Sequence, residues 1–133
     1  MIKVLINGAT GKMGQEVAKK IKSSSKFEIL CGVSKFANQP LNFPVYTNIN
    51  DIKEKPDVIV DFSVPEGALN ILAYAKSNLV PIVIATTGFS DEDLKIIDKT
   101  SKIIPIFKAA NMSYEINLMA DIASRIATRL KWM

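Results

Sequence analysis

Short apolar segments alternate with amphipathic ones along the 133 residues of the chain. The apolar segments are mostly rich in Ile and Val, have the length of strands and lack a polar face. This pattern is typical of strands that are covered on both sides of a parallel sheet. It predicts strands over residues 2–6, 27–33, 58–62, 81–85 and 103–107.

The segments between the strands place apolar residues at helical spacing. Ser90 and Asp93 form a capping-box pattern, which predicts that one helix begins near Asp91. A final helix is expected from about Tyr114 to Lys131, with basic residues near its end, where the helix dipole favours them. The three earlier stripes consist of Met13, Val17, Ala18 and Ile21, of Leu69, Leu72 and Ala73, and of Leu94 and Ile97.

Helices that alternate with buried strands predict an α/β fold. We expect one domain over residues 1–133, built as a doubly wound, mostly parallel sheet with helices on both faces. The stretch over residues 34–51 contains two prolines and several asparagines, so it is expected to be a loop. Within it we expect a short strand near Val45 and a brief helix after Asn50.

Composition and charge exclude several kinds of site and partner. Cys31 is the only cysteine and histidine is absent, which excludes an internal disulfide, the usual zinc sites and a histidine base. The net charge of +4 comes from 17 basic residues spread over the whole length, which argues against a nucleic-acid partner. No apolar run suits a membrane span and residues 1–8 lack signal-peptide features, so we expect a cytoplasmic protein.

The motif GATGKMG places Gly8, Gly11 and Gly14 between the first strand and the first helix. In a dinucleotide-binding turn, one glycine makes the bend, one lets the backbone approach the pyrophosphate, and one lets the helix pack against the strand. The helix N-terminus then offers free N–H groups to the phosphates. The turn therefore predicts a Rossmann-like, dinucleotide-binding domain; the alternative is a turn whose glycines serve packing alone.

The end of the second strand bears on the choice between NAD and NADP. An acidic residue at this place binds the ribose hydroxyls of NAD. Here the chain has Ser34 and Lys35, a hydroxyl and a cation that suit the 2'-phosphate of NADP. An ordinary surface lysine at position 35 is the alternative interpretation.

Three later motifs also follow predicted strands: DFSVPEG at residues 61–67, ATTGF at 85–89 and AANMS at 109–113. Ligands of open parallel sheets lie at the carboxyl ends of the strands, so these motifs are expected on the same edge as the glycine turn. Their small and hydroxyl side chains let a flat ring come close. Ser63, Ser90 and Ser113 could each be a helix cap instead, and for Ser90 we favour the cap.

Taken in order, these motifs resemble those of the dihydrodipicolinate reductases, also named 4-hydroxy-tetrahydrodipicolinate reductases. GATGKMG is similar to the family's G-x-x-G-R-M-G, with Lys12 in place of arginine. ATTG is similar to its G-T-T-G, with Ala85 in place of glycine. DFSVP and ANMS match its D-F-[ST]-x-P and A-N-[FM]-S, and the resemblance covers essentially the whole chain.

The resemblance implies reduction of a cyclic, imine-like dicarboxylate by hydride transfer from NADPH or NADH, in lysine and diaminopimelate biosynthesis. It also implies tolerance of both cofactors. By the same resemblance, the pyrophosphate would be held by Gly8, Ala9, Thr10, Gly11, Lys12 and Met13, the adenosine ribose by Ser34 and Lys35, the middle of the cofactor by Phe62 and Ser63, and the nicotinamide by Ala85, Thr86, Thr87, Ala109, Ala110, Asn111 and Met112.

Two departures from the family limit what the resemblance implies. Glu115 stands where the family usually has glycine, and a carboxylate there would crowd the nicotinamide or repel an anionic substrate. Family members are about twice as long, with a second domain that forms the tetramer, binds the substrate carboxylates and supplies a His-His motif followed by a lysine. Nothing in the chain matches that domain. We therefore expect a cofactor-binding half without catalytic residues, inactive alone, with an exposed apolar patch that favours a homo-oligomer.

Two other functions stay open at this point. A stand-alone nucleotide-sensing module would use the same glycine turn and would signal through a partner, with the last helix and Trp132 as its candidate contact surface. Another two-domain dehydrogenase, acting on aspartate or homoserine, is disfavoured by the ATTGF and ANMS motifs.

Overall fold

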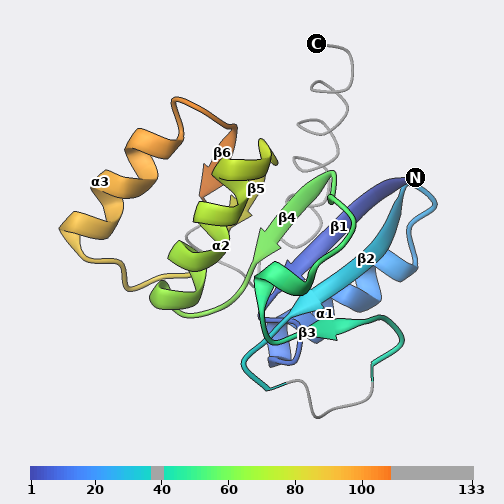
Figure 1. Ribbon diagram of the computed structural model, residues 1–133. Helices are drawn as coiled ribbons and strands as arrows, with labels where there is room; N and C mark the ends of the chain where they lie inside the picture. The colour runs from blue at the N-terminus through green and yellow to red at the C-terminus, as the bar shows by residue number, and fades with distance from the viewer. Residues whose placement is uncertain (37–40, 109–133) are drawn as a thin grey trace.

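The computed structural model describes residues 1–36 and 41–108, in which six strands form one parallel sheet of order β3-β2-β1-β4-β5-β6 (Figure 1). The strands are β1 (Ile2–Asn7), β2 (Phe27–Val33), β3 (Val45–Tyr46), β4 (Val58–Asp61), β5 (Ile82–Ile84) and β6 (Ile106–Lys108). The helices are α1 (Lys12–Lys22), the short 3-10 helix η1 (Ile49–Asp51), α2 (Pro65–Asn78) and α3 (Asp91–Thr100).

The strand order reverses direction once, between β1 and β4, and this reversal determines where a ligand site is expected. From β1 the chain adds β2 and β3 on one side, then returns to add β4, β5 and β6 on the other. The carboxyl ends of β1 and β4 therefore lie side by side at the point where the winding changes direction. In open α/β sheets this crevice is where ligands bind. The expected Rossmann-like, doubly wound fold is confirmed.

Apolar layers cover both faces of the sheet, as the two-sided strand pattern predicts. Helix α1 packs on one face, and α2 and α3 pack on the other. The α1 layer includes Val4, Ile6, Val17, Ala18, Ile21 and Val60. The α2 and α3 layer includes Leu5, Ile59, Ile71, Leu72, Ile84 and Ile97.

The strand predictions agree with the structure within one residue except for the last one. Strand β6 begins at Ile106, not at residue 103. Turns continue beyond α3, where the Ile103 N–H donates to the Thr100 carbonyl, and they leave Ile103 52% exposed. Local turn hydrogen bonds thus override the strand preference of isoleucine here. The short strand near Val45 is confirmed, and the brief helix begins at Ile49, slightly before its expected start.

The helix expected from about Tyr114 to Lys131 lies outside the described residues. The positions of the three earlier helices are confirmed, but their expected buried faces only in part. Helix α2 buries Ala68, Ile71, Leu72 and Ala75, whereas Ala73 is exposed, so that member of the expected stripe is wrong. Apolar residues are dense along α2, so their spacing alone does not decide which face meets the sheet. In α3 the capping box is confirmed and Ile97 is buried, but Leu94 is 37% exposed. No helix within residues 1–36 and 41–108 is long and apolar enough to cross a bilayer.

Candidate functional site: the carboxyl edge of the sheet

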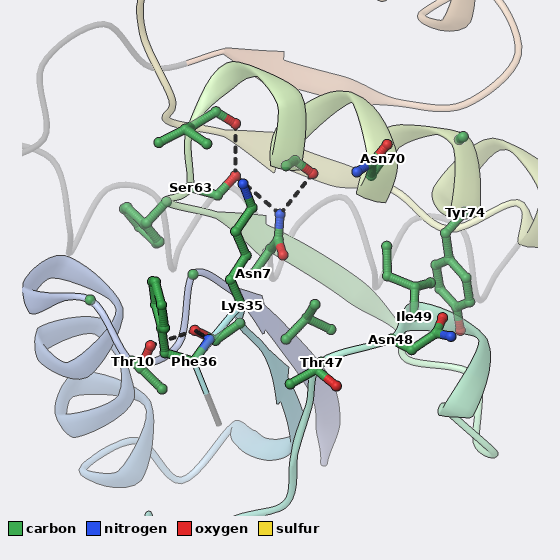
Figure 2. A pocket seen from close by; sticks show the side chains of 18 of the residues that line it. Asn7, Thr10, Lys35, Phe36, Thr47, Asn48, Ile49, Ser63, Asn70 and Tyr74 are labelled. Carbon is green, nitrogen blue, oxygen red and sulfur yellow. Dashed lines mark hydrogen bonds between the residues drawn. The ribbon is translucent and has the colours of Figure 1, made fainter. Parts of the chain in front are cut away.

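A pocket of about 890 Å³ opens at the carboxyl ends of β1, β2 and β4 (Figure 2). One wall comes from the glycine turn and the end of β2, where Thr10, Lys35 and Phe36 lie. The facing walls come from η1 and from one side of α2, which contributes Asn70 and Tyr74. The volume is in the range of pockets that bind small ligands and cofactors.

Gly8 and Gly14 are required by the shape of the glycine turn. Gly8 has a φ of +82°, and a Cβ there would lie 2.5 Å from the carbonyl oxygen of Phe62. A Cβ on Gly14 would lie 2.2 Å from the carbonyl oxygen of Gly8, so this glycine lets α1 pack onto the turn. These two positions therefore make the bend and the close packing that a dinucleotide-binding turn requires.

Gly11 is different, because nothing in the described part of the chain crowds it. Among residues 1–36 and 41–108, a Cβ there would meet only the Gly8 carbonyl oxygen, at the ordinary contact distance of 3.4 Å, and Gly11 is exposed in the pocket wall. It is also the N-cap of α1, which has no side-chain cap and no acidic residue in its first turn. The N–H groups of that turn lack helical partners and carry partial positive charge, so this helix end is suited to an anion.

Ser34 connects the glycine turn to the end of β2. It is buried, its hydroxyl is hydrogen-bonded to the hydroxyl of Thr10, and it accepts a hydrogen bond from the Phe36 N–H at 3.2 Å. The Gly8 N–H donates to the Val33 carbonyl at 2.8 Å, which adds a backbone bond between the same segments. The Ser34 hydroxyl is thus engaged within the protein and holds the pocket wall in shape.

Lys35 is the only charged side chain among the described residues that line the pocket. Its Nζ lies 4.0 Å from Oε2 of Glu66, in the first turn of α2, and both side chains are well exposed. Two exposed apolar side chains flank this place, Phe36 at 69% and Val64 at 53% exposure. The rim therefore offers a cation and apolar surface together, a combination that suits a nucleotide.

A buried carboxylate holds three strand ends together beside the pocket. Asp61, at the end of β4, is completely buried. It accepts hydrogen bonds from Asn7 Nδ2 at 2.8 Å, from Ser63 Oγ at 2.7 Å and from Thr86 Oγ1 at 2.6 Å. Asn7 also donates to the Gly67 carbonyl at 3.2 Å, so the network reaches α2. We call Asn7, Asp61, Ser63 and Thr86 the Asp61 cluster.

The Asp61 cluster can accommodate a charged or a neutral Asp61. Ser63 Oγ lies 3.1 Å from the Val64 carbonyl oxygen, and Thr86 Oγ1 lies 3.1 Å from the Ser63 carbonyl oxygen. Each hydroxyl has one proton, which can turn from the carboxylate to the carbonyl when Asp61 is protonated. Burial raises the pKa of Asp61 above its ordinary value near 3.8, while hydrogen bonds from Ser63, Thr86 and Asn7 oppose that rise.

The structure places most of the expected site residues on this one edge, but not all of them in the pocket. Gly8, Thr10, Gly11, Ser34, Lys35, Phe62 and Ser63 line it. Ala9 is buried beneath the turn, Lys12 is exposed and Met13 is half-buried in α1. Ala85 and Thr86 are buried and Thr87 is exposed beyond β5, next to the Asp61 cluster. Ala109, Ala110, Asn111 and Met112 lie outside the described residues.

Several pocket residues were not expected from the sequence. Asn7 has a recognisable signal, because an amide that ends an apolar strand immediately before a glycine turn needs a buried partner. Asn48 in the segment before η1, and Asn70 and Tyr74 on α2, also line the pocket. These three have no such signal, because in the sequence they are ordinary loop and helix-surface residues.

A comparison with known families identifies this arrangement. Residues 2–112 match the family described as "Dihydrodipicolinate reductase, N-terminus". The chain belongs to that family. The match extends from β1 through the glycine turn and the ends of β4, β5 and β6, so it includes every segment that forms the edge described above.

Curated relatives with the name 4-hydroxy-tetrahydrodipicolinate reductase agree with the family match. The relative from Caldanaerobacter subterraneus subsp. tengcongensis is 44% identical over 98% of this chain and 52% of its own length. The relative from Clostridium novyi is 39% identical over 98% of this chain and 52% of its own length. The chain thus spans about half the length of the curated relatives that it matches.

Solved structures support the same fold. A dipicolinate-bound dihydrodipicolinate reductase from Paenisporosarcina sp. TG-14 is similar to this chain with a TM-score of 0.74 and 28% identity, over 84% of this chain and 48% of its own. Homoserine dehydrogenase from S. aureus is similar with a TM-score of 0.68 and 16% identity, over 82% of this chain and 32% of its own. At that identity the second likeness shows the fold alone.

Proposed function

We propose that this chain is the cofactor-binding part of a 4-hydroxy-tetrahydrodipicolinate reductase, which reduces a cyclic dicarboxylate by hydride transfer from NADH or NADPH. The observation that carries this proposal is the uncapped N-terminus of α1 behind Gly11, open to a pocket at the switch point of the sheet. A phosphate is stabilised at such a helix end by N–H groups and by the dipole.

The proposed placement of the cofactor follows the strand order. The pyrophosphate would lie over residues 8–13, and the adenosine half would extend over Lys35 and Phe36 into the pocket. The nicotinamide half would cross Ser63 towards Ala85, Thr86 and Thr87, and onward to residues 109–112. The nicotinamide of a bound reduced cofactor would supply the hydride.

The chain's own residues would bind and orient that cofactor. The Asp61 cluster fixes the main chain at Ser63, because the Ser63 N–H also donates to Thr86 Oγ1 at 3.0 Å. This tie keeps the segments after β4 and β5 in register at the place where the cofactor would cross them. Orientation of this kind can account for a large part of a catalysed rate, about 7 to 11 kcal/mol of barrier at most.

Both cofactors are compatible with the pocket rim. Lys35 can meet the 2'-phosphate of NADPH, and the rim has hydroxyl and amide groups for the ribose of NADH. We propose that the chain binds both cofactors. The groups that bind the substrate carboxylates and that donate the proton would come from residues outside this chain. Isothermal titration calorimetry with NADH and NADPH tests binding, and a reductase assay on the same sample tests turnover. We expect binding of both cofactors and no turnover; no binding of either would contradict the proposal.

A further inference from the structure

The end of β2 lacks the residue that usually decides how a dinucleotide ribose is held. An acidic side chain there accepts hydrogen bonds from the ribose of NAD, whereas a cation accommodates the 2'-phosphate of NADP. In this chain the Ser34 hydroxyl is hydrogen-bonded to the Thr10 hydroxyl and accepts a hydrogen bond from the Phe36 N–H. Lys35 is then the remaining polar group from β2 on the pocket wall.

A carboxylate lies next to Lys35, although it is not among the residues that line the pocket. Glu66 lies in the first turn of α2, where the helix dipole stabilises a negative charge. Its Oε2 is 4.0 Å from Lys35 Nζ. Within the described part of the chain, no other carboxylate oxygen comes within 4.0 Å of this lysine.

We propose that Glu66 is a specificity-determining residue, which weakens through its charge the attraction of Lys35 for a 2'-phosphate. This inference rests on the proposed function. NADH has no 2'-phosphate, so Lys35 can stay paired with Glu66 when NADH binds. The 2'-phosphate of NADPH adds close to two negative charges at pH 7 and must share Lys35 with a carboxylate that repels it. Glu66 therefore reduces the preference for NADPH that Lys35 creates.

The size of the effect follows from the exposure of the pair. The Lys35 and Glu66 side chains are 66% and 77% exposed, so water and salt screen their charges. We expect removal of the Glu66 charge to shift the ratio of NADPH to NADH affinity by about two- to fivefold, the scale of an exposed charge interaction. The shift should shrink at high salt, because ions screen exposed charges more strongly there.

The test compares Glu66→Gln with wild type, by calorimetric titration with NADH and with NADPH at 0.02 M and about 0.5 M salt, a range over which the screening length falls several-fold. Glu92→Gln is the matched control, because Glu92 also lies in the first turn of a helix and is exposed, but it is not the carboxylate paired with Lys35. Lys35→Gln checks the other partner of the pair.

We expect Glu66→Gln to favour NADPH at low salt, Lys35→Gln to weaken NADPH more than NADH, and Glu92→Gln to leave the ratio unchanged. A ratio that moves less than twofold in Glu66→Gln, or that moves as much in Glu92→Gln, would overturn the assignment of Glu66 and leave dinucleotide binding intact. Failure of wild type to bind either cofactor would overturn the proposed function as well, so the two failures are distinguishable.

Discussion

The carboxyl edge of the sheet has an open half and a closed half. In the open half, over β1 and β2, the exposed Gly11 and the N-terminus of α1 face a pocket. In the closed half, between β4 and β5, Asp61 is completely buried and accepts hydrogen bonds from three side chains. The open half leaves the N–H groups at the start of α1 for a ligand. The closed half uses its polar groups within the protein.

This difference teaches that stability and binding can be separated by substitution at neighbouring positions. Within the described residues, every buried side-chain nitrogen and oxygen has a hydrogen-bond partner, so the closed half has no polar group to spare. Substitutions there should act mainly on the free energy of unfolding. Substitutions of exposed residues in the open half, such as Gly11, should act mainly on cofactor affinity.

The largest loss of stability is expected from Gly8→Ala. The new Cβ would lie 2.5 Å from the Phe62 carbonyl oxygen, on a backbone whose φ of +82° also strains alanine. Together these effects should lower the free energy of unfolding by about 3 kcal/mol or more. Urea denaturation followed by circular dichroism measures the change. A loss below about 1 kcal/mol would show that the turn is not built as described.

Asp61→Ala should have the next largest effect. It leaves the Asn7 amide and the Ser63 and Thr86 hydroxyls without their shared acceptor, which should cost about 2 to 3 kcal/mol of stability. Asp61→Asn keeps the shape and should cost less, because both hydroxyls have a carbonyl acceptor at 3.1 Å. Asp98→Asn, on the exposed surface of α3, is the control. Equal losses for the alanine and asparagine variants would argue against the network.

The stability of Asp61→Asn relative to wild type should also depend on pH. Because burial raises the pKa of Asp61 in the folded state, the folded protein binds this proton more tightly than the unfolded chain does. The contribution of Asp61 to stability is therefore complete below pH 3.8 and falls as the pH rises through the raised pKa. The advantage of wild type over Asp61→Asn should shrink between pH 4 and pH 7 in urea denaturation, and an advantage that grows over this range would contradict the direction of the shift.

The sequence predicts the strands better than it predicts the buried side of the helices. Strands buried on both faces are continuous apolar runs, and their positions do not depend on which face meets which neighbour. In α2 the face is decided by packing on the sheet, so Ala73 was wrongly expected to be buried. Ile103 was wrongly expected in a strand because the turn after α3 depends on hydrogen bonds to Thr100.

Some residues of the candidate site can likewise be predicted from the sequence, whereas others cannot. The glycine turn is recognisable because the spacing of its glycines reflects backbone requirements that are local. Asn70 and Tyr74 lie on α2, and the short η1 lies in the connection between β3 and β4. The two segments line one pocket, which only the folded chain brings together. Thr86, expected beside the nicotinamide, is buried and donates to Asp61, a contact between residues 25 positions apart. Such contacts depend on the assembled sheet, and a single sequence does not contain them.

The smallest change in stability and the most informative change in binding are expected at Gly11. Gly11→Ala should lower the free energy of unfolding by less than about 1 kcal/mol, because alanine is a poorer N-cap than glycine and the new methyl group meets only ordinary contacts among the described residues. Gly11→Ser should even stabilise α1 slightly, since serine is a better N-cap than glycine. Both side chains would occupy the surface that the pyrophosphate must approach.

The most direct measurement is therefore the NADH affinity of wild type, Gly11→Ala and Gly11→Ser, determined by calorimetry on samples whose folding has been verified by urea denaturation. If the open half of the edge binds the pyrophosphate, both variants should lose at least tenfold in NADH affinity, about 1.4 kcal/mol. This loss should occur although their stabilities change in opposite directions. Two folded variants that bind NADH within twofold of wild type would contradict it.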